Sequence, residues 1–194
     1  RMGLDYVDIF YHHRPDPNTP LEETVRALDG IVKSGKALYV GISNYNKEQT
    51  IAAAELFKEL GTPFIINQRK YSMFVRDIEK DGLKDYAASH GIGIITFSPL
   101  AQGLLTDRYL HGIPEDSRVR TDGRFLKEST LDEHRLDQIR KLNELALSWI
   151  LKDGDITSVL IGASKPSQIL DNIGIVHATS FSNEERRKIE EILV

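Results

Sequence analysis

The sequence predicts an α/β protein whose strands form a parallel sheet of the (β/α)8 barrel type. Short apolar runs alternate along the chain with segments of helical periodicity, which favours parallel strands joined by helices. Polar residues follow the ends of the strand-like runs, where barrel enzymes place their chemistry. No GxGxxG motif follows any strand, so the alternative, a doubly wound dinucleotide-binding sheet, lacks its phosphate-binding signature. Five strands are predicted, whereas a closed barrel has eight.

The strands are predicted from apolar runs rich in β-branched and aromatic residues, as expected for a buried parallel sheet. They are "YVDIFYH" (6–12), "ALYVGIS" (37–43), "PFIINQ" (63–68), "GIGIITFS" (91–98) and "TSVLIGA" (157–163).

The helices are predicted from apolar residues spaced three and four apart. In the first, Leu21, Val25, Leu28 and Val32 share one face. Thr19 and Glu22 have the spacing of a capping box, Pro20 suits the first helical position, and Gly35 suits the stop. Asn46 and Gln49 open a second helix that runs to Gly61. Further helices are expected at 77–89, 131–152, 166–176 and 183–193, with an irregular stretch at 102–130.

The composition excludes several classes of function. The 194 residues carry a net charge of −4, which gives no electrostatic basis for binding nucleic acid. Cysteine is absent, so disulfides and thiolate metal sites are excluded, and the six histidines form no metal-ligand grouping. No apolar run is long enough to span a bilayer, so we expect no membrane insertion. The absence of cysteine is compatible with the cytoplasmic location that we expect. Whether the protein forms a homo-oligomer stays open.

Two adjacent histidines lie where the first strand ends. Because side chains alternate between the two faces of a strand, only His13 shares the orientation of Ile9 and Tyr11, and His12 is expected to face the helix layer. His13 is held at a corner between the strand and a well-capped helix, which favours a catalytic role. Packing or solvation is the alternative for both histidines.

Polar groups at the next two strand ends suit a ligand that carries a carboxamide. Ser43 and Asn44 follow the second strand and Gln68 ends the third, and each can donate and accept hydrogen bonds. The alternative for the first two is capping of the following helix, but Asn46 already has that position.

The last two strands are followed by "FSPLAQGLL" (97–105) and "LIGASKPSQILDN" (160–172), where barrels commonly bind phosphate. Pro166 prepares a helix start whose free N–H groups favour an anion. Arg108 and Arg118 are candidates for a phosphate clamp, and Phe97 for a flat wall against an aromatic ring. The alternatives are solvated surface charges and core packing.

These segments resemble the aldo-keto reductases, especially the bacterial glyceraldehyde 3-phosphate or methylglyoxal reductases that are similar to potassium-channel β subunits. The stretches that carry the resemblance are "DYVDIFYHHRPDPNTPLEETVRAL", "GKALYVGISNYN", "FSPLAQGLLTDRYLHGIPEDSR" and "SVLIGASKPSQILDN". The resemblance implies a TIM barrel of which the chain holds about the last five strands. Residues 1–194 would be the C-terminal part of one barrel domain, with three βα units before residue 1. The family's catalytic Asp, Tyr and Lys would also precede residue 1.

The resemblance implies NADPH-dependent reduction of a small aldehyde or ketone, such as glyceraldehyde 3-phosphate or methylglyoxal. His13 takes the position of the family's catalytic histidine. The implied cofactor contacts are Ser43, Asn44, Gln68, Phe97, Ser98, Pro99, Leu100, Ala101, Gly103, Arg108, Arg118, Gly162, Ser164, Gln168, Asp171 and Asn172. The alternative is a regulatory subunit that binds the cofactor with little turnover. A histidine at position 13 weighs against it, because the channel β subunits carry asparagine there.

Overall fold

The computed structural model describes residues 3–110, 112–115, 117–121, 131–142, 145–163, 165–177 and 180–194. The chain forms two compact units, and each is described by itself. The first comprises residues 1–70, 76–97 and 155–159, and the second comprises residues 71–75, 98–154 and 160–194.

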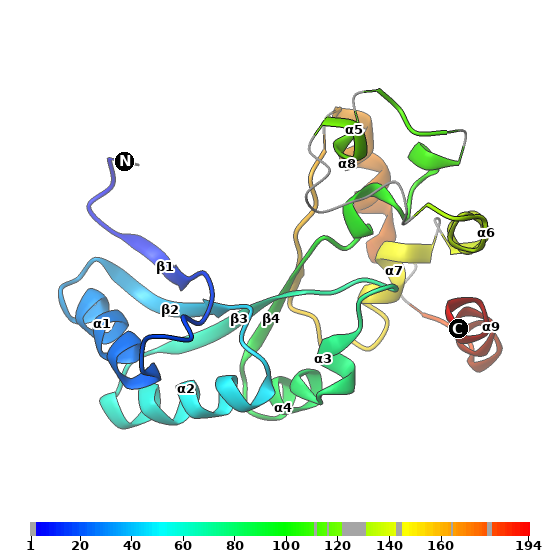
Figure 1. Ribbon diagram of the computed structural model, residues 1–194. Coiled ribbons are helices and arrows are strands. Elements are labelled where there is room, and N and C mark those ends of the chain that lie inside the picture. The colour runs from blue at the N-terminus through cyan, green and yellow to red at the C-terminus, as the bar shows by residue number, and fades with distance from the viewer. Residues whose placement is uncertain are drawn as a thin grey trace. The chain divides into compact units, whose positions relative to one another are not determined.

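The first unit contains a parallel sheet with its five strands in sequence order, as the alternating pattern predicts. Its strands are β1 (Val7–His12), β2 (Ala37–Ser43), β3 (Phe64–Lys70), β4 (Gly93–Phe97) and β5 (Ser158–Val159). Its helices are α1 (Leu21–Lys33), α2 (Lys47–Leu60), α3 (Asp77–Lys80) and α4 (Leu83–Ser89). Helices α1, α2 and α4 cover the same face of the sheet (Figure 1).

Helix α1 ends as predicted but begins differently. Gly35 adopts a left-handed conformation, with φ of 73°, and its N–H donates to the carbonyl of Val32, which stops the helix. At the start, the predicted capping box of Thr19 and Glu22 is wrong. The hydroxyl of Thr19 donates instead to Oδ2 of Asp16 at 2.9 Å, and Pro20 becomes the N-cap without a side-chain bond.

Helix α2 has the predicted capping box. The N–H of Gln49 donates to Oδ1 of Asn46 at 2.9 Å, and the N–H of Asn46 donates to Oε1 of Gln49 at 3.1 Å. The helix stops at Gly61, which is left-handed with φ of 70°. The single helix expected at 77–89 is instead split into α3 and α4 by Gly82, whose φ is 73°.

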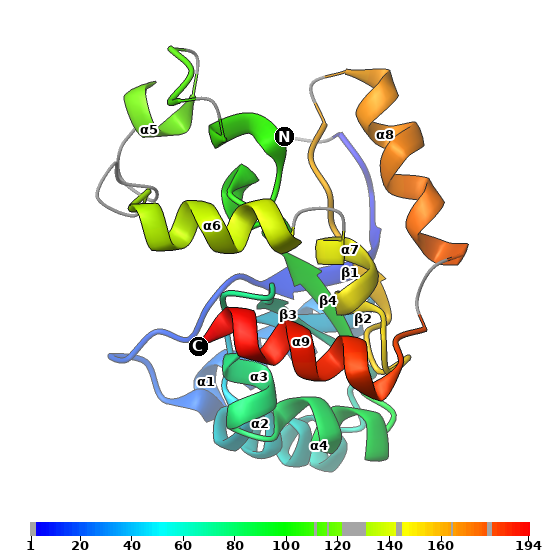
Figure 2. The same ribbon diagram turned by 90° about the vertical axis from the view of Figure 1, so that its right-hand side faces the viewer.

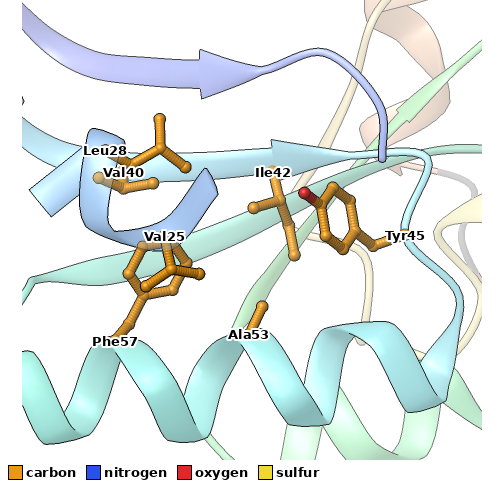
Figure 3. Packing of buried hydrophobic residues seen from close by; sticks show 7 residues of the cluster. All are labelled: Val25, Leu28, Val40, Ile42, Tyr45, Ala53 and Phe57. Atoms are coloured by element: carbon orange, nitrogen blue, oxygen red, sulfur yellow. The ribbon is translucent and has the colours of Figure 1, made fainter. Parts of the chain in front are cut away.

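A core cluster joins α1 and α2 to the face of β2 that presents Val40 and Ile42 (Figure 3). Each fully buried aliphatic or aromatic side chain of this kind contributes about 1.5–3 kcal/mol to folding. The buried members of the cluster are Val25, Leu28, Val40, Ile42, Tyr45, Ala53 and Phe57.

The other face of the sheet alternates large residues with glycines. Tyr11, Gly41, Ile66 and Gly93 are successive Cα partners across β1 to β4. A Cβ atom on Gly41 would lie 2.6 Å from the Tyr11 ring and 2.9 Å from Cγ2 of Ile66. The two large side chains therefore occupy the space above the glycine, which explains why this apolar strand contains one.

The second unit is built from short helices. They are η1 (Ala101–Gly103), η2 (Asp107–Tyr109), α5 (Arg118–Thr121), α6 (Glu133–Leu142), α7 (Ala146–Ile150), α8 (Pro166–Ile173), η5 (Gly174–His177) and α9 (Asn183–Leu193). Helices α6 and α9 lie side by side (Figure 2), joined by the buried Gln138, whose Nε2 donates to the carbonyl of Ile192 at 2.6 Å. No helix in the described ranges is both long and apolar enough to cross a membrane.

Four predicted segments of the C-terminal half differ from the structure. The helix expected at 131–152 is two helices, α6 and α7, and residues 143–144 between them lie outside the described residues. The strand expected at 157–163 pairs only over Ser158–Val159. The helix expected at 166–176 is α-helical to Ile173 and continues as the 3-10 helix η5. The stretch at 102–130 contains the short helices η2 and α5, and residues 122–130 lie outside the described residues.

The close contact at Gly41 predicts that its replacement by alanine destabilises the protein. Gly41→Ala forces the Tyr11 ring or Ile66 to move and should cost about 1–3 kcal/mol of unfolding free energy. Gly30→Ala is the matched control, because Gly30 lies within α1 and a Cβ added there would meet no neighbouring atom within 4 Å. That change should stabilise the protein by about 0.5–1 kcal/mol. Urea unfolding followed by circular dichroism measures both, and equal effects would contradict the packing argument.

Candidate functional site

Four of the predicted site residues lie together at the carboxyl ends of β1, β2 and β3. Ser43 and Gln68 are Cα partners in the last pair of the β2–β3 ladder, and His13 directly follows β1. Because the three strands are parallel and adjacent, their ends lie at the same edge of the sheet. The structure thus brings His13, Ser43, Asn44 and Gln68 to one edge.

The carbonyl oxygen of Gln68 connects the ends of β2 and β3. It accepts the N–H of Asn44 and the hydroxyl of Ser43, each at 3.0 Å. Ser43 is only 4% exposed, so its hydroxyl gains this partner in place of water. The two bonds extend the sheet pairing past the end of the β2 strand.

The side chain of Asn44 connects the ends of β1 and β2. Its Nδ2 donates to the carbonyl of His13 at 2.9 Å and to Oγ of Ser43 at 3.0 Å. Asn44 itself has φ of 65°, a left-handed conformation that asparagine tolerates better than most residues. This turn directs its side chain back across the strand ends.

His12 faces the helix layer, as alternation along the strand predicts. Its Nδ1 lies 2.8 Å from the hydroxyl of Tyr45, and the two rings meet edge to face with centroids 5.9 Å apart. Burial lowers the pKa of His12, the neighbouring His13 lowers it further, and Asp16 opposes both. Burial also raises the pKa of Tyr45. At neutral pH both partners are therefore uncharged. His13, in contrast, is exposed, and its strand has already ended.

Two amide groups at this edge are available to a ligand. Within the described ranges, no hydrogen bond occupies the side-chain amide of Gln68 or Oδ1 of Asn44. Gln68 is half-buried, so its amide is partly shielded from water. A ligand carboxamide needs one donor and one acceptor on the protein, and these groups provide both.

Phe97 ends β4, with Lys70 as its Cα partner, and is half-buried. Its position in β4 places it on the same face as Ile95 and Gly93, and thus on the face of Gly41 and Gln68 rather than that of the helices. An aromatic ring in this position can serve as a flat wall at the edge of the sheet.

The loop 98–103 belongs to the second unit and is a tight turn. Ser98, Ala101 and Gln102 have positive φ, at 55°, 47° and 63°, although none is glycine, and Gly103 follows with φ of 92°. The carbonyl of Leu100 accepts the N–H groups of Gly103 and Leu105 at 2.9 and 3.1 Å. Pro99 is buried. These internal bonds hold the turn in its conformation.

The remaining predicted contacts also belong to the second unit. Arg108 is exposed. Arg118 begins α5, but the side chain of Arg118 lies outside the described residues, as does the whole of Ser164. Gly162 and Asp171 are exposed and Asn172 is half-buried. Gln168 caps α8, because its Oε1 accepts the N–H of Lys165 at 3.1 Å. That role is structural and was not predicted.

Sequence reasoning missed two residues that support the strand ends. Asn67 is fully buried, and its Nδ2 donates to the carbonyl of Tyr45 at 3.1 Å and to Oγ1 of Thr50 at 2.9 Å. Tyr45 is 1% exposed. The available signal was an amide inside the apolar run "PFIINQ", since buried polar side chains require partners.

Comparisons with known proteins agree with the resemblance seen in the sequence. The model of the Aldo/keto reductase family matches residues 1–194. The chain is 48% identical over 205 residues to L-glyceraldehyde 3-phosphate reductase from Escherichia coli K12, covering 98% of this chain and 59% of that protein. It is 35% identical over 210 residues to a putative voltage-gated potassium channel subunit beta from Schizosaccharomyces pombe, covering all of this chain and 61% of that protein.

Two solved structures resemble the fold. The glycerol dehydrogenase from Gluconobacter oxydans superposes with a TM-score of 0.75 at 28% identity, over 98% of this chain and 59% of that one. A thermostable aldo-keto reductase superposes with a TM-score of 0.66 at 24% identity, over 97% and 60%, and supports the fold alone. The chain thus spans about three fifths of the length of the relatives that it matches.

The lowered pKa of His12 predicts a pH dependence of stability. In the unfolded chain this histidine titrates near 6.5, so as the pH falls below that value the unfolded state takes up the proton first. The free energy of unfolding should therefore decrease from pH 7 to pH 5. His12→Asn removes the titrating group, and its unfolding free energy, measured in urea at each pH, should vary less over this range. An unchanged slope would contradict the assignment.

Proposed function

Because this chain belongs to the aldo/keto reductase family, we propose that the protein containing it reduces small aldehydes or ketones to alcohols with NADPH. The observation that carries the proposal is the hydrogen-bonded edge formed by His13, Ser43, Asn44 and Gln68 at the ends of three adjacent strands. The similarity to a protein named L-glyceraldehyde 3-phosphate reductase favours a small phosphorylated aldehyde as substrate, with methylglyoxal as a second candidate.

The residues at this edge fit a nicotinamide group. Its carboxamide would bind the side-chain amide of Gln68 and Oδ1 of Asn44, which have no partner among the described residues, with Ser43 supporting Asn44. Phe97 would lie against the ring. The bound cofactor supplies the hydride. In the second unit, the turn 98–103, with Ser98, Pro99, Leu100, Ala101 and Gly103, would follow the diphosphate.

The adenosine end would be held by the rest of the second unit. Arg108 and Arg118 would pair with the phosphate that distinguishes NADPH from NADH. Gly162, Ser164, Gln168, Asp171 and Asn172 would contact the adenine end. Gln168 already caps α8, so its contribution would come through holding that helix start in place.

His13 would act on the substrate rather than on the cofactor. Its imidazole is exposed, and its backbone carbonyl accepts from Nδ2 of Asn44 at 2.9 Å. We propose that this imidazole hydrogen-bonds the substrate carbonyl oxygen, orients it, and shares in proton transfer to the alkoxide that forms.

We further propose that the chain is the C-terminal part of a single barrel domain. It spans 59% of its reductase relative, and β1 is an edge strand whose neighbourhood exposes large apolar side chains, among them Leu4 and Tyr6. Edges of this kind are normally covered. Mass spectrometry of the protein isolated from its cells should give a mass well above 21.9 kDa, and a value equal to it would contradict the proposal.

A rival function is a cofactor-binding regulatory subunit with little turnover. The observation that favours it is the 35% identity to a putative potassium channel subunit beta over the whole of this chain. The rival predicts tight NADPH binding without oxidation of the cofactor by any aldehyde.

The role of His13 predicts a selective loss of turnover in the complete protein. His13→Ala should lower kcat for glyceraldehyde 3-phosphate or methylglyoxal by about 10²-fold, because proton transfer and carbonyl orientation are lost. The affinity for NADPH, measured by fluorescence, should stay nearly unchanged.

His90→Ala is the control, since His90 is an exposed histidine at the end of α4, before β4 begins. Equal losses of cofactor affinity and turnover would reject the catalytic assignment, and wild-type oxidation of NADH as fast as NADPH would reject the cofactor preference.

A further inference from the structure

We propose that Tyr45 and His12 are a pair of positioning residues that hold the end of β1, and with it the catalytic His13. The inference rests on the proposed reductase function, because it assigns a role to residues behind the proposed catalytic histidine. Neither residue belongs to the site as the family resemblance defines it.

Side chains that follow β2 hold the chain where β1 ends. The β1–β2 ladder stops at the pair His12 and Ile42, so no sheet pairing holds the backbone beyond that point. The last residue of β1 and the residue after it are then held by two consecutive residues that follow β2. The carbonyl of His13 accepts from the Asn44 side chain at 2.9 Å, and Nδ1 of His12 lies 2.8 Å from the Tyr45 hydroxyl.

The two contacts hold different parts of the strand end, the backbone carbonyl of His13 and the side chain of His12. His13 and Asn44 meet at the carboxyl edge, where the ligand groups lie. His12 and Tyr45 meet on the helix side, since Tyr45 belongs to the core cluster with Ile42 and Ala53 (Figure 3). A single contact at the backbone fixes a strand end less completely than two contacts, because the strand can still rotate about its own axis.

Tyr45 is itself buried and hydrogen-bonded. Its side chain is 1% exposed, and its carbonyl accepts from Nδ2 of the fully buried Asn67 at 3.1 Å. Nδ2 of Asn67 is in turn shared with Oγ1 of Thr50, a buried residue of α2. Displacing Tyr45 would therefore leave buried polar groups without partners, which costs about 1–3 kcal/mol for each group.

Loss of the Tyr45 hydroxyl should thus allow His13 to move without changing the groups that bind the cofactor. In the complete protein, Tyr45→Phe should lower kcat for aldehyde reduction about tenfold, since small displacements of a catalytic group reduce the rate strongly. Its affinity for NADPH should stay within about twofold. His12→Ala should have the same effect as Tyr45→Phe, and the double variant should lose no more than either single variant.

Two further variants separate positioning from stability. His12→Asn keeps a polar atom near the place of Nδ1 and should recover part of the lost turnover. Thr62→Val is the matched control, because it also removes one buried hydroxyl. That hydroxyl donates to Oδ1 of Asp29 at 2.7 Å. Thr62 precedes β3, so it lies at the other end of the sheet from His13. This control should lose stability but keep its kcat. Wild-type kcat in Tyr45→Phe, or equal losses in Tyr45→Phe and Thr62→Val, would overturn the proposal.

The positioning role of Tyr45 can also be tested by a measurement that does not depend on enzymatic turnover. If the wild-type protein reduces no aldehyde, the proposed function fails, but the ¹⁵N signals of the His13 imidazole still decide the positioning role. These signals should broaden or shift in Tyr45→Phe and stay unchanged in Thr62→Val. Signals of His13 that are identical in the wild type and Tyr45→Phe would overturn the proposal. If Tyr45→Phe does not fold, the comparison of His12→Ala with His12→Asn takes its place, and equal kcat values in those two would overturn it.

Discussion

The carbonyl oxygen of Gln68 is the acceptor on which the candidate site depends. By accepting both the N–H of Asn44 and the hydroxyl of Ser43, it sets the direction in which the chain leaves β2. That direction returns the Asn44 side chain to the carbonyl of His13. Three strands are thereby connected beyond the last pairs of the sheet. The main-chain carbonyl of Gln68 makes these structural bonds, and the side-chain amide of Gln68 has no partner among the described residues, so it is available to a ligand.

One face of the sheet packs against the helices, and the other face carries the groups proposed to bind the ligand. Val40 and Ile42 pack against α1 and α2, whereas Gly41 and Ser43 belong to the opposite face of the same strand. A shift of β2 by one residue would bury Ser43 among apolar helices and expose Ile42. The close approach of the Tyr11 and Ile66 side chains to Gly41 opposes such a shift, since a larger residue would not fit there. The same packing that stabilises the sheet therefore fixes the face on which the ligand groups lie.

Local patterns predicted the parallel sheet, the caps of α2 and the orientation of His12, because each depends on neighbours in the sequence. The errors arose where a nearby competitor or a single glycine decided the outcome. Asp16 takes the hydroxyl of Thr19 from the expected cap, and Gly82 divides the helix expected at 77–89. The contact of His12 with Tyr45 joins residues 33 positions apart, and no local pattern encodes it. The pairing of β5 with β4 is equally non-local, which explains why its length was overestimated.

Backbone strain is concentrated at the proposed cofactor contacts. Among the described residues, the non-glycine residues with positive φ are Asn44, Ser98, Ala101 and Gln102, and all but Gln102 were implicated from the sequence. Each such conformation costs about 1 kcal/mol or more and persists only where the surroundings enforce it. At Asn44 the bonds to Gln68 and His13 enforce it, and in the turn at 98–103 the carbonyl of Leu100 does so. The folded protein already holds these strained backbone conformations, so a ligand that needs them does not have to induce them. Preformed turns of this kind raise affinity by removing the ordering cost from the binding step.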